Sequence, residues 1–185
     1  MQLGPILQVI VAVPALAPAA DWAESALGLV LTGHGRFPRE TALTLGSTAL
    51  VDAPCVALGA ATAPALLLLV EAAAPAAGGW TGLELRMPEA AGTRRGLGLD
   101  WSLASGAPAL LAATLCTADP RSARGYYRGL GAAAPAQSPW QLPLREGCLR
   151  LQAQALDRRV DGADAVAGRP LALLMTRGSV SATLP

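Results

Sequence analysis

Apolar residues form two successive patterns near the start of the chain. Residues 7–13 are an almost unbroken apolar run with four β-branched side chains, which is typical of a strand buried on both faces. After Pro14, the apolar positions of residues 19–27 recur at helical spacing, and Gly28 provides a C-cap. These patterns predict a buried strand, a short turn and an amphipathic helix.

The same arrangement returns in the second half of the chain. Residues 110–116 form another apolar run, and Asp119 and Pro120 predict a turn. Residues 121–130 then predict a helix that ends at Gly131. Two strand–turn–helix units indicate that one module is repeated.

Shorter apolar or alternating segments predict the remaining strands. They cover residues 29–32, 41–46, 55–58, 65–70, 82–87, 97–103, 148–154 and 170–175. The Gly-His-Gly sequence at residues 33–35 predicts a turn, and residues 157–168 a polar turn region. Residues 72–79 are mostly Ala, Pro and Gly and predict a linker.

Each half of the chain therefore has the element order β-α-β-β-β. We predict an α+β fold of two paired modules, the first at residues 1–78 and the second at residues 108–185. Residues 79–107 are expected to be a linker or a truncated extra module.

Composition restricts what such modules can pack and bind. Hydrophobic residues make up 52% of the chain but aromatic residues only 4%, so the core consists mainly of Ala, Leu and Val. All fourteen cationic residues are Arg, and the net charge is +1. Nucleic-acid binding needs a basic surplus on one face, so we expect no nucleic-acid partner.

The cysteines and the first residues bear on the compartment. Cys55, Cys116 and Cys148 form no CxxC pair, which favours free thiols in a reducing compartment. The apolar start of the chain lacks a preceding Lys or Arg and is interrupted by proline, which argues against a signal peptide and a membrane span. We therefore expect a cytoplasmic protein with no membrane partner.

Two features of the repeated unit occur together. Its strand ends in Val-Pro or in Ala-Asp-Pro, and its helix carries Trp22, or Tyr126 and Tyr127, and ends in Leu-Gly. Over residues 5–75 and 108–178 the chain thereby resembles the vicinal-oxygen-chelate superfamily, which includes glyoxalase I, bleomycin-resistance proteins, fosfomycin-resistance enzymes and extradiol dioxygenases. The resemblance implies that paired modules curl one mixed sheet into a half-barrel around a small-molecule pocket, with the helices outside. It also implies a homodimer, because the family commonly completes pockets across dimers.

The resemblance further implies a divalent metal held by four side chains, from the first and last strands of each module. Carried over, the positions of the first module fall on Gln8 and Glu71, whose oxygen atoms suit such an ion. Those of the second module fall near Ala112 and Met175, which are not ligands. Half of the metal site is missing, so we expect no cofactor. A divalent metal at Gln8 and Glu71, with Glu84 as a substitute ligand, is the alternative.

Two functions follow from the resemblance. The first is a glyoxalase-like or bleomycin-resistance-like protein that binds a small, largely apolar organic molecule between the modules without a complete metal site. The side chains expected at its pocket are Gln8, Glu84, Arg86, Trp101 and Trp140. The alternative is a glyoxalase-type lyase or isomerase in which Glu71 is the general base. A Ser-His-Asp triad is not expected, because His34 is the only His and lies in the predicted Gly-His-Gly turn.

Overall fold

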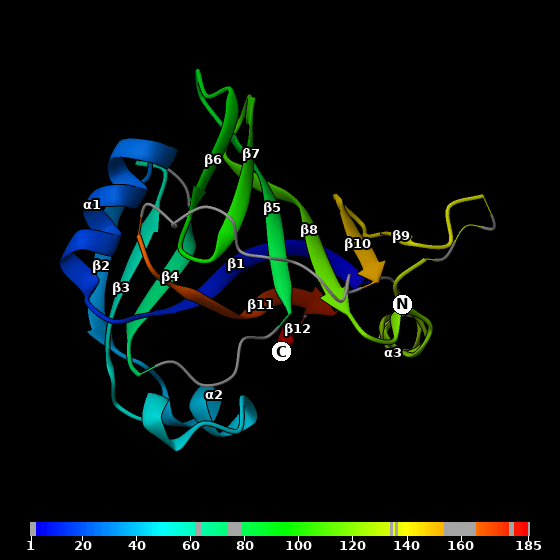
Figure 1. Ribbon diagram of the computed structural model, residues 1–185, viewed down its shortest axis with the longest axis horizontal. Coiled ribbons are helices and arrows are strands. Elements are labelled where there is room, and N and C mark those ends of the chain that lie inside the picture. Colours follow the sequence, from blue (N-terminus) through cyan, green and yellow to red (C-terminus); the bar gives the residue numbers. More distant parts are fainter. Residues whose placement is uncertain are drawn as a thin grey trace.

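The computed structural model describes residues 3–61, 64–73, 79–133, 135, 137–153, 166–177 and 180–184, and Figure 1 shows their arrangement. The helices are α1 (Leu16–Leu27), α2 (Arg39–Thr44) and α3 (Pro120–Gly129), with a 3-10 turn at Thr48–Leu50. The strands are β1 (Leu3–Val13), β2 (Val30–Arg36), β3 (Pro54–Gly59), β4 (Ala65–Glu71), β5 (Trp80–Met87), β6 (Gly92–Gly96), β7 (Leu99–Ser105), β8 (Ala109–Thr117), β9 (Gln141–Pro143), β10 (Cys148–Ala153), β11 (Arg169–Arg177) and β12 (Val180–Leu184). The predicted linker at 72–79 and the polar turn region at 157–168 lie largely outside the described residues.

The first half-sheet has the strand order β2-β3-β4-β1-β11-β12. β1 runs parallel to β4, the antiparallel strands β3 and β2 follow outward, and α1 connects β1 to β2. This is the β-α-β-β-β order expected for the start of the chain. On its other side β1 pairs antiparallel with β11, and Val9 lies opposite Leu173.

The second half-sheet has the strand order β9-β10-β8-β5-β7-β6, with β8 and β5 antiparallel at its centre. β10 lies parallel to β8, and β7 lies parallel to β5. On each side of the central pair, β8 and β5, the next strand outward therefore runs parallel to its neighbour. The connections differ, because α3 follows β8 whereas a short turn follows β5. The half-sheets join where Ile6 of β1 pairs with Leu110 of β8. The predicted α+β class with a curled mixed sheet forming a half-barrel is confirmed.

One strand pairing differs from the prediction. Residues 170–175 lie in a strand as expected, but this strand, β11, pairs with β1 instead of completing the second module. The strand that lies parallel to β8 is β10, in which Leu149 is opposite Ala113. An apolar run indicates that a strand is buried and carries no information about its partner.

Helix α1 forms where the helical spacing predicted it. Its buried residues Ala19, Ala23 and Leu27 lie on one stripe, and Gly28 ends the helix with a φ of 69°. Glycine adopts this left-handed conformation without the steric penalty of a Cβ atom. No helix in the described ranges is long and apolar enough to cross a membrane.

Two local predictions after α1 are wrong. The Gly-His-Gly sequence at residues 33–35 continues β2, in which His34 pairs with β3 instead of forming a turn. Residues 41–46 were expected to form a strand, but most of them belong to α2. In α2, Ala42 is fully buried and Leu43 is 55% exposed. An alternation over so few positions does not distinguish a strand from one turn of helix.

The hydrophobic core has two parts. In the larger part, α1, one face of β1 and one face of the second half-sheet pack together around Trp101. In the smaller part, Phe37 and Leu50 join Ile10 and Ala12, so α2 and the 3-10 turn cover the other face of β1. The first half-sheet is thereby covered on both faces, whereas polar side chains line the second face of the other half-sheet.

The start of α3 shows how one carboxylate links helix stability to pH. Asp119 caps the helix: its Oδ1 accepts hydrogen bonds from the amides of Arg121 (3.1 Å) and Ser122 (3.0 Å), and its Oδ2 accepts one from the Ser122 hydroxyl (2.6 Å). These bonds, above all that of the hydroxyl, lower the pKa of Asp119. Because the folded pKa is lower than the unfolded one, the stabilisation is complete above about pH 4 and is lost as the pH falls through the folded pKa.

We expect Asp119→Ala to lower the melting temperature at about pH 7, and the difference from the wild type to shrink toward about pH 3. Thermal unfolding followed by circular dichroism at both pH values measures this difference. Ser25→Ala is a control without a carboxylate, because the Ser25 hydroxyl only donates to α1 carbonyls. A loss for Asp119→Ala of the same size at both pH values would contradict the capping role of the charged carboxylate.

Candidate functional site

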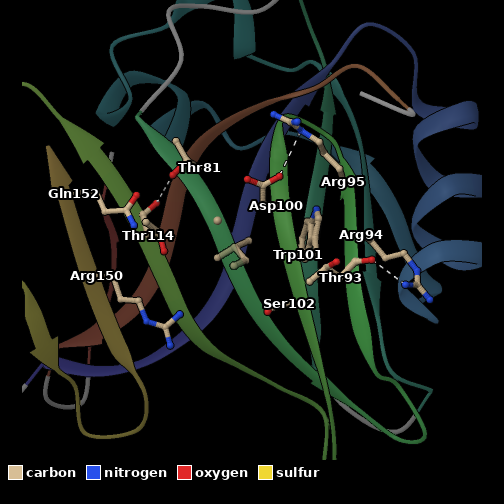
Figure 2. Close-up of a pocket in the computed structure, with 12 residues that line it drawn as sticks. Thr81, Thr93, Arg94, Arg95, Asp100, Trp101, Ser102, Thr114, Arg150 and Gln152 are labelled. Atoms are coloured by element: carbon tan, nitrogen blue, oxygen red, sulfur yellow. Dashed lines mark hydrogen bonds and ion pairs between the residues drawn. The ribbon is translucent and has the colours of Figure 1, made fainter. Parts of the chain in front are cut away.

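A cavity of about 580 Å³ lies on the polar face of the second half-sheet. Strands β5, β6, β7, β8 and β10 all contribute to it, and Figure 2 shows the lining residues. They are Thr81, Gly82, Leu83, Thr93, Arg94, Arg95, Asp100, Trp101, Ser102, Thr114, Arg150 and Gln152. The volume falls in the range of small-molecule pockets, about 300–1,000 Å³.

Strand alternation explains why this face is polar. In β7, Leu99 and Trp101 point into the core, so Asp100 and Ser102 lie on the opposite face. In β10, Leu149 and Leu151 are buried in the same way, which places Arg150 and Gln152 on the cavity side. The polar lining therefore follows from the same pleat that builds the core.

Four residues form one row across the floor of the cavity. Asp100 of β7 pairs with Gly82 of β5, Gly82 pairs with Thr114 of β8, and Thr114 pairs with Arg150 of β10. Three strand spacings separate the Cα atoms of Asp100 and Arg150 by about 14 Å. The two charged side chains thus stand at the ends of the row, and a glycine and a threonine lie between them. Since Gly82 has no side chain, the space above the middle of the row stays open.

An ion pair fixes the Arg150 end of this row. Arg150 Nη2 lies 2.8 Å from Glu84 Oε2, and the side chains are 40% and 28% exposed, respectively. The pair spans β8, in which the residue opposite Glu84 is the small Ala112. The hydrogen bond to Glu84 raises the pKa of the Arg150 guanidinium further above its usual value. Arg150 is therefore a permanent, positioned cation at the cavity, and in Figure 2 its guanidinium points toward the middle of the half-sheet.

A second ion pair lies at the other end. Arg95 Nε is 3.4 Å from Asp100 Oδ1, and here the carboxylate is the more exposed partner, at 52% against 43%. Hydroxyl and amide groups complete the lining: Thr81 Oγ1 donates to the carbonyl oxygen of Thr114 over 3.5 Å, and Ser102 and Gln152 are exposed. The apolar residues among the lining, Leu83 and Trp101, are 3% and 1% exposed. The exposed side chains of the lining are accordingly charged, hydroxyl or amide side chains.

The structure does not bring the two expected metal positions together. Gln8 Nε2 donates to the carbonyl oxygen of Ala65 over 3.3 Å, and Glu71 Oε2 accepts from the amide of Leu16 over 3.0 Å at the start of α1. Glu71 lies opposite Val13, five residues along β1 from Gln8, which corresponds to about 17 Å. Neither residue lines the cavity.

The other predicted positions are dispersed. Glu84 reaches the cavity through its contact with Arg150, and Trp101 forms part of the floor while its indole lies in the core. Arg86 Nε donates to the carbonyl oxygen of Ala107 over 2.8 Å, near the end of β5. Trp140 is 42% exposed next to β9, away from the lining. Met175 is fully buried in β11, where it pairs with Ile6.

The side chains at the cavity do not form a ligand set for a divalent metal ion. Both carboxylates, those of Glu84 and Asp100, have an arginine as partner, and the remaining lining donors are hydroxyl, amide and guanidinium groups. Divalent ions need several oxygen or imidazole ligands that are not already engaged in ion pairs. Among the described residues, no three His, Cys, Asp or Glu side chains are arranged to hold a metal ion.

Several lining residues were not predicted as site residues from the sequence, among them Thr81, Asp100, Ser102, Thr114, Arg150 and Gln152. The available signal was the alternation within residues 97–103 and 148–154, which places their polar residues on one face. What was lacking was the pairing of β7, β5, β8 and β10, which brings those faces together.

The architecture defines a glyoxalase-like fold. The chain is similar to the crystal structure of a glyoxalase I mutant from Zea mays, with a TM-score of 0.51, 13% sequence identity, and coverage of 91% of this chain and 73% of that chain. At this identity the similarity shows the fold alone. Neither a protein-family model nor a curated protein sequence matches the chain.

Proposed function

We propose that this protein is a member of the vicinal-oxygen-chelate superfamily that binds a small polar organic molecule in the cavity of the second half-sheet, without a divalent metal. The observation that carries the proposal is the row of Asp100, Gly82, Thr114 and Arg150. Its two charged side chains stand at the ends, and the small residues Gly82 and Thr114 leave open space between them. Small-molecule sites use a few fixed polar groups in this way to orient a ligand.

The lining favours a polar ligand over the largely apolar one expected from the sequence. Its two large apolar residues, Leu83 and Trp101, are buried, so they offer little surface to a ligand. An apolar molecule would displace water from the exposed hydroxyl groups and from the remaining N–H donors of Arg150 without replacing its hydrogen bonds, which costs about 1–3 kcal/mol for each neutral group and more for a charge.

The alternative of a lyase or isomerase with Glu71 as general base has no supporting contact. The Glu71 carboxylate accepts the Leu16 amide at the start of α1, outside the lining of the cavity. In the proposal Glu71 is therefore a structural residue of the first half-sheet. The homodimer and the cytoplasmic location remain predictions.

We expect Gly82→Phe to abolish ligand binding while the fold is retained. A Cβ atom at Gly82 would lie no closer than 3.5 Å to Asp100 and Thr114, so a side chain fits at its base and the phenyl ring fills the floor of the cavity. Gly33→Phe is the matched control: it lies in β2, and a Cβ atom there has no neighbour within 4 Å. Both variants add the same ring, but at different faces of the molecule.

Three probes that differ at one carbon test the binding: D-glucitol, D-gluconate and D-glucamine, which are neutral, anionic and cationic. Saturation-transfer NMR at about 10 mM detects millimolar affinity. We expect at least one probe to bind the wild type and Gly33→Phe but not Gly82→Phe. If no probe binds the wild type, or if Gly82→Phe binds as the wild type does, the proposed function is wrong.

A further inference from the structure

We infer that the ligand of this cavity is a hydroxy carboxylate, with its carboxylate group on Arg150 and its hydroxyl groups directed toward Asp100. This inference rests on the proposed ligand-binding function and specifies the chemical class of ligand. It is drawn from the difference between the two ends of the row that crosses strands β7, β5, β8 and β10, with Asp100 at one end and Arg150 at the other.

The two ion pairs expose opposite partners. In the pair of Arg150 and Glu84 the cation is more accessible, with 40% of its side chain exposed against 28% for the carboxylate. In the pair of Arg95 and Asp100 the carboxylate is more accessible, with 52% against 43%. At the Arg150 end the hydrogen-bond donors of a cation are therefore the more accessible groups, and at the Asp100 end the acceptor is more accessible than its partner Arg95. A molecule with an anionic end and hydroxyl donors complements both.

Arg150 retains the donors that a carboxylate requires. A guanidinium has five N–H donors in a planar fork, and the contact with Glu84 is made through Nη2 alone. The thiol of Cys148, two residues earlier on the same face of β10, also lies beside the guanidinium. Bidentate binding of a carboxylate uses two parallel N–H donors, which still fit on this group. Because Glu84 already orients the side chain, less rotamer freedom is lost when a ligand binds.

The lining between the ends matches hydroxyl groups. The side chains of Ser102 and Thr114 can each donate and accept a hydrogen bond, the Thr81 hydroxyl, which donates to the Thr114 carbonyl, can accept one, and Gln152 adds an amide. The cavity and its rim carry three guanidinium groups and, with Glu84, two carboxylates, which leaves one net positive charge. This net positive charge disfavours a cationic ligand. A neutral polyol would not use the charge of Arg150.

The same three probes test this inference on the wild type, without any substitution. D-gluconate and D-glucitol share five carbons and their hydroxyl groups and differ only in a carboxylate against a hydroxymethyl group. We expect D-gluconate to bind about tenfold or more tightly than D-glucitol, because a hydrogen-bonded charge contributes more than a neutral hydroxyl. D-Glucamine is expected to bind more weakly than either.

Variants at Arg150 locate the anchor. Arg150→Gln should reduce D-gluconate affinity to that of D-glucitol, while Arg150→Lys, which keeps the charge but lacks the fork, should retain part of the preference. Arg39→Gln makes the same change of charge at an exposed position at the start of α2 and should leave the preference unaltered. Melting temperatures establish that each variant is folded.

The outcomes separate this inference from the proposed function. If D-glucitol binds as tightly as D-gluconate, and Gly82→Phe abolishes both, the cavity is a binding site but the carboxylate inference is wrong. If Arg150→Gln and Arg150→Lys both prefer D-gluconate over D-glucitol as strongly as the wild type does, Arg150 does not bind the carboxylate of the ligand. If none of the probes binds the wild type, both the function and the inference fail.

Discussion

Trp101→Ala is expected to lower the free energy of unfolding by about 3–5 kcal/mol, the range found when a large aromatic side chain is removed from a core. Trp101 is 1% exposed, and its ring centroid lies 6.5 Å from that of Trp22 on α1. Its Nε1 also donates to the carbonyl oxygen of Gly96 over 3.1 Å. The indole connects the first half-sheet, through α1, with β6 and β7 of the second, so its loss loosens the contact between them.

Urea denaturation followed by circular dichroism measures this loss. Trp140→Ala is the matched control, because it removes the same side chain from a position that is 42% exposed. We expect that variant to stay within about 0.5 kcal/mol of the wild type. Equal losses for the two variants would show that the indole of Trp101 is not a core element.

Gly98→Ala is expected to lower the free energy of unfolding by at least about 2 kcal/mol. Gly98 has a φ of 73°, and a left-handed backbone costs a residue with a Cβ atom about 1–2 kcal/mol. A Cβ atom there would also overlap the carbonyl oxygen of Gly168 and approach Pro170 Cδ to 3.0 Å. Such overpacking adds about 1–3 kcal/mol. The turn between β6 and β7 would have to move away from the segment that leads into β11.

Gly28→Ala separates the two contributions. Gly28 has nearly the same φ, 69°, but a Cβ atom at that position has no neighbour within 4 Å. This variant should therefore show only the backbone contribution of about 1–2 kcal/mol. Chemical denaturation of both variants gives the comparison. If Gly98→Ala is no less stable than Gly28→Ala, the close approach of residue 98 to Gly168 does not contribute to the loss in free energy of unfolding.

Local structure can be predicted from this sequence where one pattern extends over enough residues. The apolar run at 7–13 and the helical spacing at 19–27 lead to β1 and α1, and the repeat leads to β8 and α3. Short or polar segments fail. Residues 92–96, for which no element was predicted, form the edge strand β6, whose mostly exposed residues carry no apolar signal.

The site was predictable only in part, because its residues come together through long-range pairing. The alternation in residues 82–87 and 148–154 identifies Glu84 and Arg150 as members of polar faces, but it does not reveal that these faces meet across β8. The family pattern leads instead to Gln8 and Glu71, which lie on the first half-sheet. The cavity lies on the other half-sheet, between strands that the sequence did not show to be neighbours.

The pairing of β1 with β11 affects how the chain can fold during synthesis. Val9 pairs with Leu173, so one edge of this largely buried strand finds its partner only after residue 173 has been synthesised. At about 5–20 residues per second, the ribosome delivers that partner roughly 10–30 s after β1. Until then β1 exposes unpaired N–H and C=O groups on an apolar strand, which is a template for pairing with other chains. The topology therefore leaves this edge of β1 open to other chains until β11 has been synthesised.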